Sequence, residues 1–289
     1  MESPLVVIVG PTASGKSSLA IDLAEQFGGE IICADSRTVY KGMDIGTAKP
    51  SPEDQARVKH WGLDLVEPGE PFSVADFQKY AYEKITDIRA RGKIPFLVGG
   101  SGLYVDAVVF EFQFTPIDSG LHAKLEEMSL EELHDYCFEN NIILPENKKN
   151  KRYVVRAIER KNVDLTRLTE PQQNTIIVGI TTEKDILHKR IHERSEHLFE
   201  SGMIEEAIAL GTKFGWENEA MTGNIYKLVK QFVDGTITKD ELKLQNETAD
   251  RQLAKRQMTW LKRNPFIKWL ELDYAQKYIA RRLAETTSA

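Results

Sequence analysis

Residues 10–17 have the types and the spacing of a phosphate-binding loop. They read GPTASGKS and satisfy G-x-x-x-x-G-K-[ST] between an apolar run that predicts a strand and a segment that predicts a helix. Glycines let the backbone wrap so that several N–H groups point at one anion, and the helix N-terminus adds partial positive charge. The expected phosphate-binding residues are therefore Gly10, Pro11, Thr12, Ala13, Ser14, Gly15, Lys16 and Ser17.

Two side chains of this P-loop carry specific roles. Lys16 supplies a formal charge to the phosphate oxygens, and the Ser17 hydroxyl is placed to bind Mg²⁺, the expected cofactor. The motif alone predicts nucleotide or polyphosphate binding, ATP included, without naming a reaction. Because no apolar run ending in Asp-Glu is evident near the sheet, a mechanical ATPase is disfavoured. A small-molecule kinase and a group transferase remain.

Asp35 and Ser101 follow two further predicted strands, at residues 30–34 and 94–98. The carboxyl ends of parallel strands meet at one crevice, so both side chains are expected near the P-loop. Asp35 is a candidate general base for a weak nucleophile such as the exocyclic amine of adenine. The alternatives are that Asp35 caps a helix or binds Mg²⁺ through water. Ser101 offers a hydroxyl to a substrate base or to the leaving phosphate, unless its Gly-rich turn is only structural.

A parallel sheet must position these residues. Apolar runs predict strands, and apolar residues at helical spacing predict helices between them. Strands are expected at 5–9, 30–34, 94–98, 175–180 and 267–272, and helices at 16–27 and 74–91. This alternation predicts an α/β fold, a P-loop NTPase-like parallel sheet flanked by helices.

The pattern changes twice along the chain. Residues 118–160 consist of short, charged, helix-forming stretches, which predict a small helical insertion domain. The expected core domain is therefore 1–117 together with 161–289. Its C-terminal region is helical from 183 to 263, with predicted breaks at Gly202, Gly215, Gly223 and Gly235.

The charge pattern limits how the chain can bind nucleic acid. A formal net charge of −6 argues against binding over the whole surface, so any RNA site must be local. The two basic clusters are Lys148, Lys149, Lys151, Arg152 and Arg156, and Arg251, Lys255, Arg256, Lys262 and Arg263. The second cluster either contacts phosphate or forms a solvated helix face. Arg190 and Arg194, one turn apart on another helix, either face phosphate or pair with neighbouring glutamates.

Other classes of protein are disfavoured. Cys33 and Cys137 are far apart and lack the spacing of a zinc site or a disulfide framework. The apolar stretch at residues 5–9 is far shorter than the roughly 20 residues of a membrane span. We expect a cytoplasmic monomer that contacts no membrane.

Several long segments resemble one known family, the tRNA dimethylallyltransferases, also called tRNA isopentenyltransferases. The matching segments occur in family order and span nearly the whole chain. They are GPTASGKS, ADSRTVYKGMDIGTAKP, VGGSGLYVDA, KRYVVRAIE, HERSEHLFESGMIEEA and RQLAKRQMTWLKR.

The resemblance implies an activity. Dimethylallyl diphosphate would bind the P-loop with Mg²⁺, and Lys16 would stabilise the departing pyrophosphate. Asp35 would deprotonate N6 of the adenosine immediately 3′ of the anticodon (adenosine 37), beside Ser101. The insertion would close on the anticodon stem. The tRNA-binding residues would be Asp35, Ser36, Arg37, Thr38, Arg152, Tyr153, Val154, Val155 and Arg156, with Arg251, Lys255 and Arg256 contacting tRNA phosphates.

The chain departs from the family pattern at two positions and in length. Ile225 stands where a glycine is usual, Thr222 stands where some members have a substrate-binding arginine, and the insertion is short. Three alternatives remain: a nucleoside or shikimate-type kinase, a prenyltransferase for free adenine nucleotides, and a non-enzymatic RNA-binding module. The first would leave the basic helices without a purpose, and the insertion argues against the second.

Overall fold

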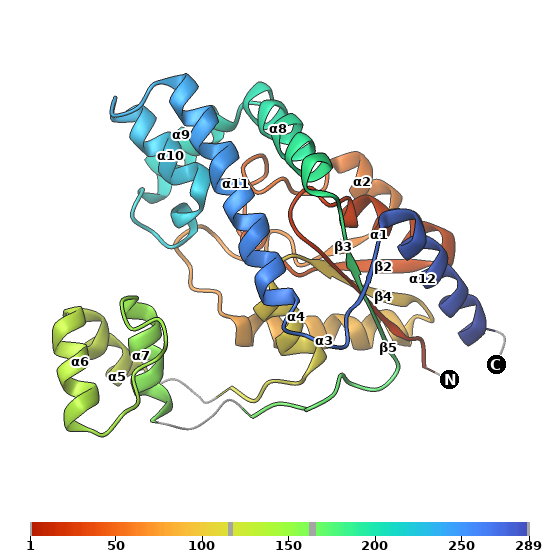
Figure 1. Ribbon diagram of the computed structural model, residues 1–289, viewed down its shortest axis with the longest axis horizontal. Helices are drawn as coiled ribbons and strands as arrows, with labels where there is room; N and C mark the ends of the chain where they lie inside the picture. The colour runs from red at the N-terminus through yellow and green to blue at the C-terminus, as the bar shows by residue number, and fades with distance from the viewer. Residues whose placement is uncertain (1, 115–117, 162–165, 288–289) are drawn as a thin grey trace. The chain divides into compact units, whose positions relative to one another are not determined.

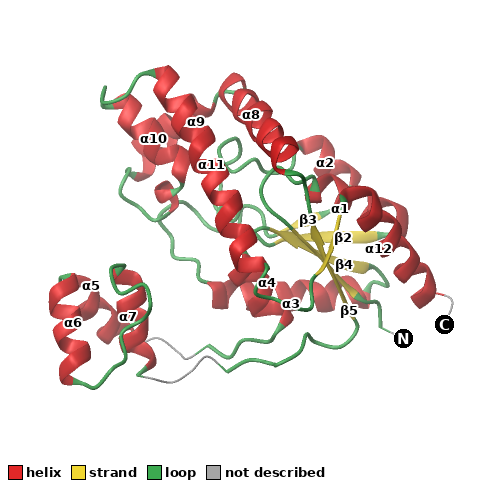
Figure 2. Ribbon diagram, viewed as in Figure 1, coloured by secondary structure: helices red, strands yellow, loops and turns green. Residues whose placement is uncertain are grey.

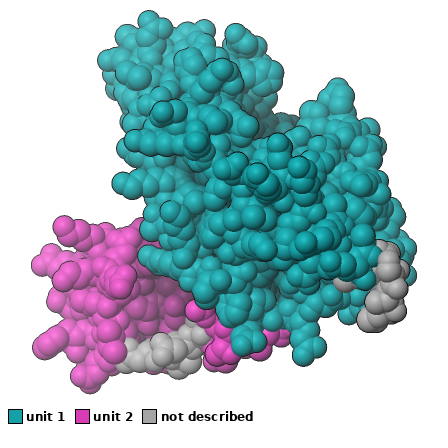
Figure 3. Space-filling model, turned by 45° about the vertical axis from the view of Figure 1, so that its right-hand side comes forward, with its two compact units in different colours: residues 1–110, 170–289 teal, residues 111–169 magenta. Residues whose placement is uncertain are grey.

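The computed structural model describes residues 2–114, 118–161 and 166–287. These residues form two compact units (Figure 3): residues 1–110 with 170–289 are unit 1, and residues 111–169 are unit 2. The expected insertion, 118–160, lies within unit 2. Its first boundary, at residue 117, falls outside the described residues.

A six-stranded sheet in the order β3-β2-β4-β1-β5-β6 organises unit 1. All neighbouring strands are parallel. The strands are β1 (Leu5–Val9), β2 (Gly29–Cys33), β3 (His60–Trp61), β4 (Ile94–Gly99), β5 (Thr175–Ile180) and β6 (Lys268–Leu270). The expected parallel α/β sheet is confirmed, although β6 is shorter than the predicted strand. β3 was not predicted because two residues carry no periodic pattern.

Helices cover both faces of this sheet (Figures 1 and 2). α1 and α12 pack together on one face, where their apolar residues share a core with alternate residues of the strands. α3 and α4 contact each other and β4. The helices of this part are α1 (Lys16–Phe27), α2 (Pro52–Arg57), α3 (Val74–Ala90), α4 (Gly102–Val109) and α12 (Leu272–Thr287).

The remaining helices of unit 1 form a second core. It also takes in Val39, Tyr40 and Met43, from the segment that follows β2. Ile225, one of the departures from the family pattern, is buried in this core. The elements are α8 (Lys184–Glu200), α9 (Met203–Phe214), the 3₁₀ turn η1 (Ala220–Thr222), α10 (Asn224–Val233) and α11 (Lys239–Leu261). Each predicted glycine break falls between two of these elements.

Unit 2 consists of α5 (Ser119–Glu127), α6 (Leu130–Glu139) and α7 (Lys151–Arg160). It has an apolar core of its own, to which α7 contributes Val154, Val155 and Ile158. Of the helices that the structure describes in either unit, none has the length and apolar character needed to span a membrane.

Glu30 ties one edge of the sheet together. Its side chain is 2% exposed. It accepts hydrogen bonds from Trp61 Nε1, Arg91 Nη2 and Lys93 Nζ, each at 2.8 Å. These donors, Arg91 first, hold the pKa of the Glu30 carboxyl at about 2, against an ordinary 4.5. The carboxylate therefore connects β2, β3 and the turn between α3 and β4.

Replacing Glu30 with glutamine is expected to lower the free energy of unfolding at neutral pH by about 1–2 kcal/mol. The full shift would imply more, but Arg91 and Lys93 are partly exposed and water screens the pairs. Because the folded pKa is depressed, this stability is present above about pH 4.5 and is lost as pH falls toward 2. Urea unfolding at neutral and acidic pH measures it. Asp87→Asn, which removes an exposed partner of Arg91, is the matched control. An equal loss at both pH values would contradict the assignment.

Candidate functional site

The P-loop joins β1 to the N-terminus of α1. Ala13 and Gly15 have φ angles of 61° and 88°, the left-handed conformation that turns the chain back on itself. The Ser14 N–H donates to the Pro11 carbonyl at 3.3 Å. Lys16 begins α1 and its Nζ donates to the same carbonyl at 3.1 Å. The backbone thus forms a closed loop at a helix N-terminus, where an anion is stabilised.

Two arginines of α8 lie against the P-loop. Arg194 Nη1 donates to Thr12 Oγ1, and Arg190 Nη1 donates to the Ser14 carbonyl at 3.3 Å. The two glutamates that could have paired with them bind lysines instead, Glu193 with Lys189 and Glu196 with Lys243. The sequence left open whether these arginines face phosphate or pair with neighbouring glutamates. In the structure they face the phosphate loop.

Two buried donors at this loop lack a protein partner. Among the described residues, Ser14 Oγ and Arg194 Nε are buried without a hydrogen bond. Burying a polar group unpaired is costly, and such groups at a site are commonly satisfied by a ligand or ion. Both groups are suited to donate to an anion, and they lie on residues that already contact or form the P-loop.

The pKa of Lys16 reflects its burial first and its charged neighbours second. Burial and the neighbouring Arg194 lower the pKa of Lys16 from 10.5 to about 8, while the nearby Asp35 opposes the shift. A phosphate anion beside the ammonium would favour its charged form. Asp35 and Arg194 therefore lie close enough to Lys16 to interact with it, at the crevice edge of the sheet.

α11 places Gln257 between the P-loop and the end of β4. Gln257 Oε1 accepts the Thr12 N–H at 2.8 Å. Its amide nitrogen lies so near Gly100 that a Cβ there would be 2.3 Å away. One turn on, Trp260 covers Gly102 and donates Nε1–H to Asp106 at 2.7 Å. Gln257 was not among the predicted site residues, although its place in the matching segment AKRQMTW was a usable signal.

Gln257→Glu is expected to weaken binding of a diphosphate about 10-fold. The new carboxylate can still accept the Thr12 N–H, but it adds a negative charge beside the anion site, worth on the order of 1 kcal/mol. Calorimetric titration with pyrophosphate measures the change. Gln252→Glu makes the same charge change at an exposed position of the same helix and should leave affinity unaltered. Equal effects of the two variants would show that only net charge matters.

Asp35 and Ser101 meet at the neighbouring strand ends. The Ser36 N–H donates to Ser101 Oγ at 3.2 Å, and the Ser101 N–H donates to the Ala34 carbonyl at 3.4 Å. Asp35 Oδ1 accepts the Arg37 N–H at 2.8 Å. The segments after β2 and β4 therefore form one polar surface that includes the two residues.

Arg37 and Thr38 are held by the protein itself. The Arg37 guanidinium donates to the Glu219 and Ala220 carbonyls at 2.9 and 3.2 Å and to Thr222 Oγ1 at 3.1 Å. Thr38 is 5% exposed. The structure thus brings Thr222 into contact with a guanidinium from a different segment. Arg37 anchors the loop after β2 to η1.

The basic residues at the end of α11 line an open cavity of about 210 Å³. Arg251 lies apart from this cavity and forms an ion pair with Glu247. The Arg263 guanidinium lies 5.8 Å from the centre of the Trp260 ring. The lining residues are Lys255, Arg256, Thr259, Trp260 and Arg263.

In unit 2, the expected RNA-binding helix α7 has two faces. Val154 and Val155 are 0% and 1% exposed in the core, so a direct contact of these side chains with RNA is not compatible with their burial. Arg152 and Tyr153 lie on the surface. Arg156 Nη1 pairs with Glu159 Oε2 at 2.8 Å. The polar face of the helix, rather than its whole length, is therefore the part that can meet a ligand.

A magnesium ion at the P-loop would have few ligands from the protein itself. Within residues 2–114, 118–161 and 166–287, no group of three or more His, Cys, Asp and Glu side chains is placed to hold a metal. Ser17 is exposed at the start of α1. Mg²⁺ commonly keeps several waters and binds through substrate phosphates, so one hydroxyl at a phosphate loop is an adequate donor set.

The fold and the site define a protein of the α/β class whose sheet carries a cationic, glycine-rich loop suited to an anion. The sequence model of the IPP transferase family matches residues 38–264, and that of the isopentenyl transferases matches residues 3–64. The chain belongs to the IPP transferase family, the family of the tRNA dimethylallyltransferases.

Individual relatives agree along the whole chain. The tRNA dimethylallyltransferase of Geobacillus thermodenitrificans is 36% identical, covering 97% of this chain and 94% of the relative. That of Geobacter sulfurreducens is 39% identical, covering 93% and 92%. The crystal structure of the full-length tRNA isopentenylpyrophosphate transferase from Bacillus halodurans has a TM-score of 0.76 at 35% identity and covers 99% of each chain. A eukaryotic dimethylallyltransferase acting on tRNA shares the fold, with a TM-score of 0.77 at 24% identity over 93% of this chain and 74% of that one.

Proposed function

We propose that this protein transfers a dimethylallyl group from dimethylallyl diphosphate to N6 of adenosine 37 of tRNA, immediately 3′ of the anticodon, and releases pyrophosphate. The observation that carries the proposal is a pair of unpartnered buried donors at the P-loop, Ser14 Oγ of the loop itself and Arg194 Nε of the adjacent α8, beside Lys16. Family membership, with relatives named for this reaction, supports the donor and the acceptor.

In the proposed reaction, the bond between the primary carbon of the donor and its diphosphate oxygen breaks, and the electron pair leaves with the diphosphate. The adenosine nitrogen forms the new C–N bond, and its proton passes to the Asp35 carboxylate. Lys16 and the P-loop amides stabilise the charge that develops on the leaving group. Ser101, beside Asp35, orients the acceptor amine.

Mg²⁺ is the proposed cofactor, with the Ser17 hydroxyl as its protein ligand. A bound magnesium ion would neutralise part of the charge on the diphosphate oxygens. Arg190 and Arg194 supply permanent positive charge from the other side of the loop, since guanidinium groups stay protonated.

For the tRNA, we propose two basic surfaces. One is the end of α11 around Lys255 and Arg256, with Arg251 behind it. The other is the polar face of α7 together with the exposed Lys148 and Lys149, which would contact the anticodon stem. A local cationic surface on an acidic chain suits the recognition of one part of a large polyanion. The protein acts as a monomer in the cytoplasm, where its tRNA substrate is found.

The test is incubation of the purified protein with labelled dimethylallyl diphosphate, Mg²⁺ and unmodified tRNA. Parallel reactions contain AMP or ATP as acceptor, and a tRNA with guanosine in place of adenosine 37 is the matched control. We expect label in the tRNA that has adenosine 37 and none in the tRNA that has guanosine there. Label in the free nucleotides alone would move the activity to cytokinin-type synthesis, and no transfer to any acceptor would exclude a prenyltransferase.

A further inference from the structure

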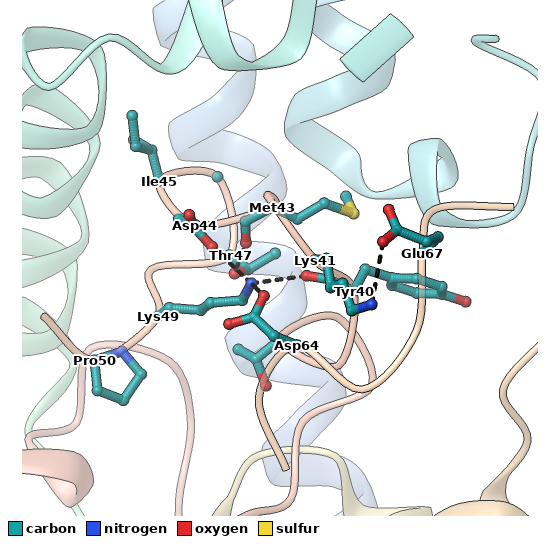
Figure 4. A network of polar contacts seen from close by, with 12 residues as sticks. Tyr40, Lys41, Met43, Asp44, Ile45, Thr47, Lys49, Pro50, Asp64 and Glu67 are labelled. Atoms are coloured by element: carbon teal, nitrogen blue, oxygen red, sulfur yellow. Dashed lines mark hydrogen bonds and ion pairs between the residues drawn. The ribbon is translucent and has the colours of Figure 1, made fainter. Parts of the chain in front are cut away.

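Lys49 is a lysine outside the P-loop whose side chain is buried. Its side chain is 4% exposed. The ammonium donates to the Tyr40 carbonyl at 2.7 Å and to one carboxylate oxygen each of Asp44 and Asp64 at 2.6 Å (Figure 4). An ammonium has three hydrogens. All three hydrogens are therefore used, and their acceptors come from two segments of the chain, one with Tyr40 and Asp44 and the other with Asp64.

These two segments also pair through their backbones. Tyr40 forms a parallel bridge with Val66, and the Lys41 N–H donates to the Val66 carbonyl at 2.9 Å. The Leu65 N–H donates to the Val39 carbonyl at 2.7 Å. Lys49 crosses this pairing, because its partners lie on both sides of it. Its charge therefore holds residues 38–41 against residues 64–66.

Glu206 of α9 holds the middle of the same loop, residues 44–46. Its carboxylate accepts the N–H groups of Asp44, Ile45 and Gly46 at 2.9, 2.6 and 3.0 Å, and the Tyr226 hydroxyl at 2.8 Å. Lys49 thus binds a carbonyl and one carboxylate of residues 40–49 together with the carboxylate of Asp64, while Glu206 binds three amides of the same loop. The loop has a fixed place against the helices of unit 1.

The loop continues directly into the acceptor side of the site. Asp64 N–H donates to the Thr38 carbonyl at 3.2 Å, and the Tyr40 N–H donates to the Arg37 carbonyl at 3.2 Å. The Arg37 N–H in turn donates to the Asp35 carboxylate. We propose that Lys49 is a positioning residue for the acceptor half of the site. It fixes the segment that follows β2, and Asp35 lies near the start of this segment. This inference rests on the proposed function, because Asp35 is there the base for the tRNA amine.

Removing the ammonium changes the balance of charge without opening the core. In Lys49→Met, the Tyr40 carbonyl loses its donor, and two carboxylates that shared one cation face each other. Asp44 and Asp64 are 62% and 49% exposed, so they can turn into water and the chain stays folded. The pairing of residues 38–41 with 64–66 loosens, and with it the position of Asp35. A displacement on the order of 1 Å of a reacting group can cost 100-fold in rate.

The test compares Lys49→Met with Lys41→Met. Lys41 lies on the same loop but is 48% exposed and forms one ion pair with Glu67. For Lys49→Met, we expect kcat/KM for tRNA to fall about 10- to 100-fold, while affinity for dimethylallyl diphosphate and the melting temperature stay close to wild type. Lys41→Met should match the wild type in all three. Asp64→Asn added to Lys49→Met should restore part of the lost activity, because it removes one of the opposed charges.

Hydrogen exchange gives a readout that does not need turnover. In Lys49→Met the amides of Lys41, Leu65 and Val66 should exchange faster, with those of the P-loop unchanged. The proposal would be overturned if Lys49→Met kept the wild-type kcat/KM for tRNA. It would also be overturned if the variant lost donor and acceptor affinity equally and had a lower melting temperature. A wild-type protein without transferase activity would refute the proposed function instead, and the exchange experiment would still test whether Lys49 holds this loop.

Discussion

Asp35→Asn is expected to lower kcat for prenyl transfer about 10²- to 10⁴-fold, with little change in the affinity for dimethylallyl diphosphate. Asparagine has the same shape and can still accept the Arg37 N–H, so the loop after β2 keeps its conformation. It cannot take the proton of the adenosine amine. Single-turnover transfer to tRNA, with donor saturating, measures the loss directly.

The control for Asp35→Asn is Asp22→Asn, which neutralises an exposed carboxylate that pairs with Arg57 on the far side of α1. This variant should transfer at the wild-type rate. If Asp35→Asn also kept a rate within a few-fold of wild type, the proton would have to leave by another route. Asp35 would then be a binding residue rather than the base.

Lys16→Met should lower kcat/KM for the donor about 10²- to 10³-fold, because in the proposed reaction the ammonium stabilises the charge on the leaving diphosphate. Lys16→Arg, which keeps the charge but changes its position, should lose less. The affinity of Lys16→Met for pyrophosphate, measured by calorimetry, should fall by a similar factor, because the contact between Lys16 and the diphosphate does not require the acceptor. Unaltered pyrophosphate affinity in Lys16→Met would place the anion elsewhere.

The lowered pKa of Lys16 adds a pH dependence to this second prediction. Because burial brings the pKa to about 8 in the free protein, the ammonium is charged below that pH and neutral above it. Donor affinity should therefore fall as pH rises through 8 in the wild type. In Lys16→Arg the guanidinium stays charged, and this step should disappear.

Local patterns predicted every described strand except β3, as well as the P-loop sequence and the glycine breaks, because each depends on neighbouring residues. Long-range contacts carried no such signal. Thr12 and Gln257 are 245 residues apart, and Arg190 reaches Ser14 across 176 residues. The sequence left the partner of Arg190 and Arg194 open for this reason. Val154 and Val155 were grouped with RNA-binding residues because they belong to a matching segment, whereas their periodicity on α7 places them in a core.

The sheet order has a consequence for synthesis on the ribosome. β1 lies in the middle of the sheet, between β4 and β5, so the apolar run Leu5–Val9 has no strand partners when it emerges. At translation rates of about 5–20 residues per second, the segment with Gln257 follows Thr12 by roughly 12 to 50 seconds. Until β4 and β5 have also been made, the β-prone segment Leu5–Val9 lacks its strand partners and is open to pairing with other chains. The phosphate motif is therefore made well before the segment with Gln257 that completes its site.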